Sequence, residues 1–156
     1  GGPLLDSAGR LIGINTAIYS PSGASAGIGF AVPVDTVMRV VPQVIRTGRY
    51  IRPGLGIDVD GRINQHLASS TGVAGVFVLQ VRPGGAAEKA GLAGVRRDPR
   101  GIVPGDVIVA VEGEAVADPA ALDRRLDDFK VGDVVQLLVE RGGQQRQVSI
   151  TLQPGA

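Results

Sequence analysis

The chain of 156 residues has no cysteine, no tryptophan and a single histidine, His66. Without cysteine it forms no disulfide, holds no thiolate metal site and has no cysteine nucleophile. One histidine also excludes a metal site built from several imidazoles. Aromatic residues make up only 3% of the chain, so aliphatic side chains and alanine must fill any core. We therefore expect no metal ion and no other cofactor.

The chain also lacks an excess of charge and a long apolar run. Lysine and arginine number 16 against 15 aspartates and glutamates, a net charge of +1. With no basic excess to neutralise phosphates, binding to nucleic acid is not expected. No apolar run approaches the roughly 18 residues of a membrane span. The 24 glycines and 10 prolines indicate many short elements joined by tight turns.

The first part of the chain reads as short β elements followed by a helix. Residues 11–19 are rich in β-branched side chains and predict a strand, and residues 28–32 predict a second strand that ends at Pro33. Asp35 is a candidate N-cap for a helix with apolar residues at helical spacing up to Gly48. Pro42 lies within this pattern and should kink or divide the helix.

From residue 52 onward the sequence predicts a more complete unit. Asp118 followed by Pro119 is a strong helix start, and Leu122, Leu126 and Phe129 then share one face. A second, short helix is predicted at residues 86–90. Strands are predicted at residues 55–59, 75–81, 106–112, 134–140 and 147–152. The predicted fold class is mainly β with two to three helices (α+β), and this unit forms a small, partly open β-barrel or sandwich. It can bury its own core, whereas residues 1–32 cannot.

One glycine-rich string, residues 22–29, resembles the turn of short-chain dehydrogenases that binds a dinucleotide (Gly23 to Gly29). That turn must open a helix, yet Pro33 follows Gly29 by four residues and removes a backbone donor. The family's Tyr-x-x-x-Lys pair is also absent. A dinucleotide-binding dehydrogenase fragment is therefore the less favoured alternative.

A hydrolytic triad would need a histidine base within reach of a nucleophile and a carboxylate. Only His66 is available, and residues 64–67 read as a polar loop with a solvent-facing histidine. The residues themselves therefore show no catalytic apparatus.

The informative short motif is Gly54-Leu55-Gly56-Ile57. Glycines on either side of a leucine, just before a strand, free several backbone N–H groups to point into one concavity, which suits a carboxylate. If the strand keeps an open edge beside the helix of Leu122 and Leu126, a peptide can add there as an extra strand. The same four residues also fit an ordinary tight turn into a core strand, so both interpretations remain open.

Two sets of motifs occur in the order and spacing of one protein family. Residues 1–18 and 27–33 resemble the end of the trypsin-like domain of the HtrA/Deg serine proteases, in which Gly-Gly-Pro-Leu directly follows the nucleophilic serine. The remainder resembles the PDZ domain that follows in this family. The motifs that carry this second likeness are Gly54-Leu55-Gly56-Ile57, residues 86–92, residues 104–108 and a Deg-type insertion at residues 93–102.

The resemblance implies a division into three parts. Residues 1–33 would be orphan β-strands of a trypsin-like barrel, residues 34–49 a connecting helix and residues 50–153 a PDZ domain. In the first part, Asn15, Thr16 and Ala17 would be remnants of the substrate-cleft wall. Because the chain starts without methionine, immediately after the position of the family's serine, we expect a piece of a longer protein. The catalytic serine, histidine and aspartate would lie upstream, so this chain alone would not cleave peptides.

By the same resemblance, the chain is the peptide-binding module of a serine endopeptidase in protein quality control. The backbone N–H groups of Leu55, Gly56 and Ile57 would bind the terminal carboxylate of an unfolded or misfolded protein. Gly54 would support this loop. Arg52 would attract the carboxylate only weakly, because an exposed arginine is screened by solvent.

The bound peptide, a C-terminus or an extended segment of an unfolded protein, would add to the sheet by β-augmentation. Ile57 and Val59 would pair with the peptide strand and flank it, while Leu122 and Leu126 line the pocket for its last apolar side chain.

The resemblance further implies a periplasmic or membrane-associated setting, and a homotrimeric parent. From the residues, the apolar stretch 11–18 presents a strand edge without a partner sheet. We expect that stretch to be disordered, packed on the second unit or self-associated in an oligomer.

Overall fold

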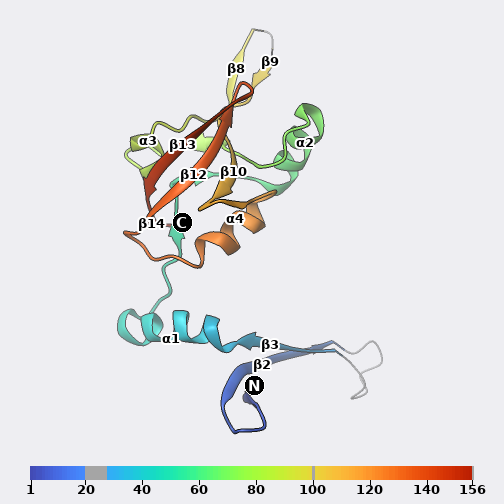
Figure 1. The fold of residues 1–156 in the computed structure, drawn as a ribbon, viewed down its shortest axis with the longest axis vertical. Helices are drawn as coiled ribbons and strands as arrows, with labels where there is room; N and C mark the ends of the chain where they lie inside the picture. The colour runs from blue at the N-terminus through green and yellow to red at the C-terminus, as the bar shows by residue number, and fades with distance from the viewer. Residues whose placement is uncertain (20–27, 100, 156) are drawn as a thin grey trace. The chain divides into compact units, whose positions relative to one another are not determined.

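The computed structural model describes residues 1–19, 28–99 and 101–155 (Figure 1). The chain divides into two compact units, Gly1–Tyr50 and Ile51–Ala156. Each is considered by itself below.

The first unit is a three-stranded antiparallel sheet followed by a helix. The strands β1 (Pro3–Leu5), β2 (Leu11–Tyr19) and β3 (Ile28–Pro33) lie in the order β1-β2-β3. The expectation that residues 11–18 form an edge without a partner is therefore wrong, because β2 is the central strand. A tight turn brings β1 back against β2: the Asp6 carboxylate accepts hydrogen bonds from the N–H groups of Ala8 and Arg10, both at 2.9 Å.

The helix α1 (Val34–Thr47) begins directly after β3. Pro33 is its N-cap, so the prediction that Asp35 caps it is wrong: Asp35 already lies in the first turn. Pro42 does not divide the helix, although it has no N–H to donate within it. Gly48 closes α1 in the left-handed conformation at φ 73°, and its N–H donates to Val44 O.

The described part of the first unit, residues 1–19 and 28–50, has no hydrophobic core of its own. Among its described residues no hydrophobic side chain is buried, and large apolar side chains such as Ile18, Phe30, Met38 and Ile45 are exposed. This agrees with the expectation that residues 1–32 cannot bury a core.

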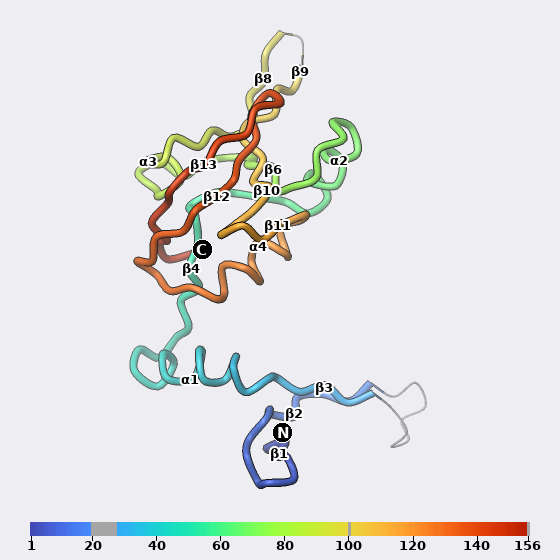
Figure 2. The backbone as a smooth tube through the Cα atoms, in the orientation of Figure 1, coloured from blue at the N-terminus to red at the C-terminus, as the bar shows by residue number. Residues whose placement is uncertain are grey.

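The second unit is built on a five-stranded antiparallel sheet in the order β11-β10-β12-β13, with β6 paired to β10 (Figures 1 and 2). Its strands are β6 (Val76–Phe77), β10 (Val107–Val111), β11 (Glu114–Ala115), β12 (Val134–Arg141) and β13 (Gln144–Thr151). Three two-stranded ribbons pair β4 (Pro53–Gly54) with β14 (Gln153–Pro154), β5 (Ile57–Asp58) with β7 (Gln80–Val81), and β8 (Arg96–Asp98) with β9 (Gly101–Val103). The tube in Figure 2 shows that β4, near the start of this unit, lies beside the C-terminal end of the chain.

Three helices complete this unit: α2 (Gly61–Thr71), α3 (Ala86–Lys89) and α4 (Pro119–Leu126). The predicted α+β class, dominated by antiparallel strands, is confirmed. The described residues contain four helices, however, and not two to three. The predicted strands 55–59 and 75–81 are also shorter in the structure, where only β5, β6 and β7 remain of them.

The additional helix is α2, where the sequence analysis placed a polar loop at residues 64–67. Asp60 caps its start, because its carboxylate accepts from the N–H groups of Arg62 and Ile63, both at 2.9 Å. Asn64 is buried and donates to Gly75 O at 3.0 Å while it accepts from Phe77 N at 2.8 Å. Asn64 thus forms hydrogen bonds with backbone groups at β6, which explains why a polar residue occupies a buried position of this helix.

The core is aliphatic, as the composition predicts. The main cluster lies between the large sheet and α4, and a smaller one of Leu67, Phe77 and Val107 lies under α2. Fully buried members of the main cluster are Val76, Val78, Ala87, Ile108, Val111, Val135, Leu137 and Val139.

The helix α4 and the hairpin of β12 and β13 begin and turn at the residues that the sequence indicates. Asp118 caps α4, since its carboxylate accepts from Ala121 N at 2.7 Å, and Pro119 is the first helical residue. Phe129 lies beyond the end of α4, although it still packs against the core. The hairpin of β12 and β13 turns at Gly142 and Gly143, which have φ values of 60° and 80°.

Candidate functional site

A groove of about 160 Å3 lies between the segment that carries β4 and β5 and the helix α4. Leu122 and Leu126 are 3% and 4% exposed and reach it from α4. Its remaining lining residues are Arg52, Pro53, Gly54, Leu55, Gly56, Ile57, Val59, Arg82, Asp123, Asp127 and Gly155. The structure therefore brings together all eight residues that were predicted to form or support one site in this unit.

In the loop between β4 and β5, the carbonyl groups accept hydrogen bonds, whereas two of the N–H groups donate none within the described residues. Leu55 O accepts from Ala87 N and Gly56 O accepts from Arg82 N, both at 2.9 Å. The N–H groups of Leu55 and Gly56 donate to no acceptor within residues 1–19, 28–99 and 101–155. Two backbone donors at the end of the groove are thus available to a ligand.

A third donor, the N–H of Ile57, follows from the register of β5. Ile57 lies opposite Val81 in the antiparallel pair with β7, and the bond from Arg82 N to Gly56 O flanks that pair. In such a ladder the two residues form a non-hydrogen-bonded pair, whose own N–H groups point away from each other. The Ile57 N–H therefore points toward the free edge of β5.

The edge of β5 that faces away from β7 has no partner strand within the described part of the chain. Ile57 and Val59 lie two residues apart, so their side chains share one face of this edge. Both are half-buried and pack against the main core. An extended segment laid along this edge would meet main-chain donors and acceptors on one side and an apolar surface beneath.

Gly56 has φ 76°, a conformation that favours glycine. A Cβ atom at this position would lie 2.8 Å from Nε2 of Gln153, which packs behind the loop. Gln153 Oε1 also accepts from Ala86 N, the first residue of α3, at 2.6 Å. Gln153 thus holds the loop and α3 together, a role that no short-range pattern in the sequence indicates.

Two ion pairs lie at the groove, and neither of them includes Asp123. Arg52 Nε lies 3.5 Å from Asp127 Oδ1, and Arg82 Nη2 lies 2.9 Å from Asp58 Oδ1. The Arg52 side chain is 61% exposed, so its attraction for an anion is screened as expected and is also offset by Asp127. The sequence analysis missed Asp127, Arg82 and a further acid, Asp123, because their place beside the loop depends on the tertiary fold.

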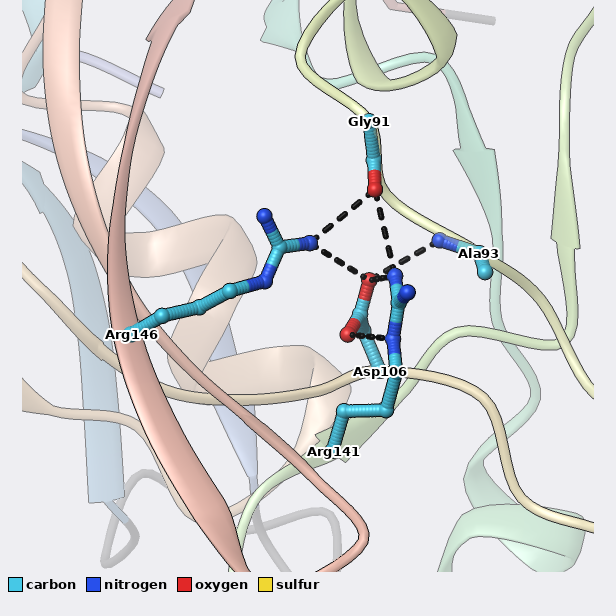
Figure 3. A network of polar contacts seen from close by, with 5 residues as sticks. All are labelled: Gly91, Ala93, Asp106, Arg141 and Arg146. Atoms are coloured by element: carbon cyan, nitrogen blue, oxygen red, sulfur yellow. Dashed lines mark hydrogen bonds and ion pairs between the residues drawn. The ribbon is translucent and has the colours of Figure 1, made fainter.

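A buried carboxylate holds the far end of α3 (Figure 3). Asp106 is 0% exposed and accepts from Arg141 at 2.7 Å (Nε) and 2.6 Å (Nη2), and from Ala93 N at 2.8 Å. Gly91 O in turn accepts from Arg141 and from Arg146, at 3.1 and 3.0 Å. Through α3, whose Ala87 N–H binds Leu55 O, this network supports the loop of the groove.

Burial by itself would raise the pKa of Asp106. The hydrogen bonds from Arg141 and Ala93, with the positive charges of Arg141 and Arg146, outweigh it and hold that pKa below its ordinary value of 3.8. Asp106 is therefore ionised at neutral pH and carries no proton for chemistry.

A larger hollow of about 380 Å3 lies between α3 and β13. Its wall is the outer edge of the large sheet, and α3 packs beside that edge. Apolar residues such as Ile150 and Leu152 line it too, but its described lining holds no glycine loop with free N–H donors, so the groove at β5 is the better candidate site.

In the first unit, Asn15, Thr16 and Ala17 lie in β2 at an irregularity of its pairing with β3. Thr16 Oγ1 donates to Phe30 O at 3.1 Å, and all three residues line a hollow of about 540 Å3 with Gly29 and Phe30. That they are part of a substrate cleft stays a prediction.

The described residues do not form the other kinds of site considered, which are a hydrolytic triad, a dinucleotide-binding turn and a metal site. His66 is exposed on α2, and no hydrogen bond joins it to a hydroxyl or carboxylate within the described residues. Gly29 lies in β3 and not at a helix start, which removes support for the dinucleotide alternative; residues 22–27 of that string lie outside the described residues. In the same described ranges, no group of three or more acidic, histidine or cysteine side chains is placed to hold a metal ion. None of the four helices described is both long and apolar enough to cross a membrane.

The sequence matches one family profile, described as "PDZ domain", over residues 53–152. Protease Do-like 1, chloroplastic, of Arabidopsis thaliana is 52% identical over 157 residues, 99% of this chain and 35% of that protein. A probable periplasmic serine endoprotease, DegP-like, of Brucella suis biovar 1 is 39% identical over 155 residues, 97% of this chain and 28% of that protein. The chain spans about a third of the length of these curated relatives.

Solved structures of similar proteins share the fold. The HtrA-type protease AlgW with a decapeptide is 34% identical at a TM-score of 0.67, and the match covers 100% of this chain and 46% of that chain. A serine endoprotease from Yersinia pestis is 28% identical at a TM-score of 0.58, with 100% and 47% covered.

Proposed function

Because this chain belongs to the PDZ-domain family, as the PDZ region of an HtrA/Deg family protease, we propose that its second unit binds the C-termini of other polypeptides. The observation that carries this proposal is the meeting of three features in one groove. Among the described residues, N–H groups without an acceptor lie at one end, a strand edge without a partner forms one wall, and apolar side chains of α4 form the other.

The terminal carboxylate binds the N–H groups of Leu55, Gly56 and Ile57. Charge-assisted bonds from backbone donors are about twice as strong as neutral ones, and these donors need no rearrangement to receive an anion. Gly54 and the left-handed Gly56 give the loop its path, while the exposed Arg52 adds only a weak long-range attraction.

The peptide chain continues from the carboxylate as a strand antiparallel to β5. Its main chain bonds to the free edge of that strand, beside Ile57 and Val59. Its last side chain enters the pocket formed with Leu122 and Leu126, where an aliphatic group is removed from water. Full burial of a valine- or leucine-sized side chain contributes roughly 1.5–3 kcal/mol, which favours peptides that end in such residues.

For the whole protein, we propose a serine endopeptidase of protein quality control that captures unfolded or misfolded chains through this unit. The names of the relatives, which include serine endoproteases, support this, and a homotrimeric assembly is proposed from the family resemblance. The bacterial relatives named periplasmic favour a periplasmic setting, whereas the plant relative is named chloroplastic. In this proposal the chain described here supplies binding and not cleavage, because its single histidine, exposed on α2, is hydrogen-bonded to no hydroxyl or carboxylate in the described ranges.

The experiment that tests the binding function is a titration with two fluorescent peptides of the same sequence. One ends in valine with a free carboxylate, and its twin ends in valine amide as the matched control. We expect saturable micromolar binding of the acid and at least a tenfold loss for the amide, which corresponds to about 1.4 kcal/mol. Equal affinities would refute carboxylate recognition by the loop. Absence of binding by both peptides would refute the peptide-binding function as a whole.

A further inference from the structure

We propose that Asp123 makes the groove select peptides with lysine or arginine as the third residue from the C-terminus, an inference that rests on the proposed function. Asp123 lies on α4 and lines the groove beside the two leucines. Its selectivity follows from where α4 places it along the peptide and from the lack of an ion pair between Asp123 and any cation of the described residues.

The direction of α4 fixes the position of Asp123 along the groove. The C-terminal end of the helix lies at the loop between β4 and β5 (Leu55 and Gly56), here called the carboxylate loop. Asp127 pairs with Arg52 beside this loop, and α4 contacts β4. Its N-terminal end follows β11 and leads away from β4, as the tube shows (Figure 2). Asp123 precedes Asp127 by four residues, which is just over one helical turn or ~6 Å farther from the carboxylate.

An extended peptide presents alternate side chains to the same wall. Successive residues of a strand rise about 3.3 Å, so the last side chain and the third from the end lie ~6.6 Å apart on one face. When the last side chain lies at Leu126, the third from the end therefore lies at the level of Leu122 and Asp123. The penultimate side chain points to the opposite side, away from α4.

Asp123 has a carboxylate that no cation in the described part of the chain neutralises. Its neighbours three and four residues away on α4 are Pro119, Ala120, Leu126 and Asp127, and none of them is basic. No ion pair involves Asp123 within residues 1–19, 28–99 and 101–155.

The two cations that line the groove are both engaged elsewhere. Arg52 pairs with Asp127, and Arg82 forms two hydrogen bonds with Asp58, at 3.1 and 2.9 Å. The free carboxylate at the middle of the groove therefore attracts a cationic side chain and repels an acidic one. Because the long stem of lysine or arginine also covers Leu122, the apolar wall is not left exposed.

The experiment compares peptides that share a free C-terminal valine and differ only at the third residue from the end, which is lysine, glutamine or glutamate. With the full chain at about 0.1 M salt, we expect the lysine peptide to bind about fivefold more tightly than the glutamate peptide. A fivefold ratio in affinity is within the range of exposed ion pairs. Here the attraction of Asp123 for lysine adds to its repulsion of glutamate. In about 1 M salt, where the Debye length falls from ~10 to ~3 Å, the ratio should fall below twofold.

Two variants assign this selectivity to Asp123. Asp123→Asn should reduce the lysine-to-glutamate ratio below twofold, and Asp123→Lys should reverse it. Glu114→Gln is the matched control, because it removes an equally exposed negative charge from β11, outside the groove lining; its ratio should stay near fivefold. Lysine at the penultimate position is the matched peptide control and should bind equally to the parent chain and to Asp123→Asn.

A fivefold ratio that persists in Asp123→Asn, or equal binding of the lysine and glutamate peptides to the parent chain, would overturn the inference. Either result would leave the proposed function intact so long as C-terminal amidation still weakens binding. If amidation has no effect or no peptide binds, the proposed function fails first and this inference fails with it.

Discussion

The buried carboxylate of Asp106 offers the sharpest test of how the second unit is held together. In Asp106→Asn the side chain keeps its shape but loses its charge and one of its two acceptor oxygens. The amide nitrogen that replaces that oxygen then faces N–H donors, from Arg141 on one side or from Ala93 on the other. The substitution thus breaks at least one short hydrogen bond and weakens the remaining ones.

The expected loss of stability follows from these contacts. Hydrogen bonds to charged groups contribute about 1.5–3 kcal/mol each, and removal of one partner from a buried pair costs about 3–5 kcal/mol. The Arg141 and Arg146 side chains are 44% and 42% exposed, so water can replace part of what they lose. We therefore expect the free energy of unfolding to fall by about 2–3 kcal/mol, or Tm by roughly 10–15 °C for a domain of this size.

The pH dependence gives the prediction a second, independent readout. The folded state holds the pKa of Asp106 below 3.8, mainly because the bonds from Arg141 and Ala93 outweigh the effect of burial. A depressed pKa in the folded state stabilises the protein fully above the pKa of the unfolded state, about 3.9. That contribution disappears as the pH falls through the lower, folded value. The difference between parent and variant should therefore be constant near neutral pH and shrink below about pH 4.

The assay is urea unfolding followed by circular dichroism at several pH values from 7 to 2. Arg146→Gln is the control variant, because its guanidinium lies 3.4 Å from Asp106, farther than that of Arg141 at 2.6 Å; it should lose less than about 1 kcal/mol. An unchanged midpoint in Asp106→Asn, or a difference from the parent that is the same at pH 7 and pH 2, would refute the reasoning.

Substitutions at three further positions test separate parts of the second unit. Asn64→Ala should lower the free energy of unfolding by about 2–3 kcal/mol, because it leaves the N–H of Phe77 and the carbonyl of Gly75 buried without partners; a loss below 1 kcal/mol in urea unfolding would contradict this. Asp118→Ala should cost about 1 kcal/mol through loss of the cap of α4, and Asp118→Ser should recover most of it in the same assay. Gly56→Ala should cost about 1–2 kcal/mol because its φ of 76° disfavours a Cβ atom, and it should weaken binding of the acid peptide in a fluorescence titration; unchanged affinity would argue against a role for this loop geometry.

Local signals in the sequence were sufficient for several elements. Asp118 and Pro119 mark the start of α4 because a cap and a proline at the first helical position act within one turn of chain. The glycine pair at the β12–β13 turn sets that hairpin in the same local way. The candidate groove was found from Gly54 to Ile57 and from the two leucines of α4, since loop and helix each carry their own pattern.

Other features depend on contacts between distant parts of the chain. The helix α2 was missed because Asn64 and His66 read as loop residues, whereas Asn64 is buried and bonds to the segment that leads into β6. Gln153 bonds to Ala86 across 67 residues, so its place behind the carboxylate loop has no local signal. The same holds for Asp123, whose lack of a cationic partner becomes visible only when the groove is assembled.

The central claim is that the N–H groups of Leu55, Gly56 and Ile57 bind a peptide carboxylate. The most direct measurement records amide chemical shifts of the 15N-labelled chain during titration with the acid peptide and with its amidated twin. We predict that these three amides show the largest downfield proton shifts with the acid, and much smaller ones with the amide at equal saturation. Equal shifts with both peptides, or shifts centred on residues 149–153 beside α3, would contradict the claim and move the binding site elsewhere.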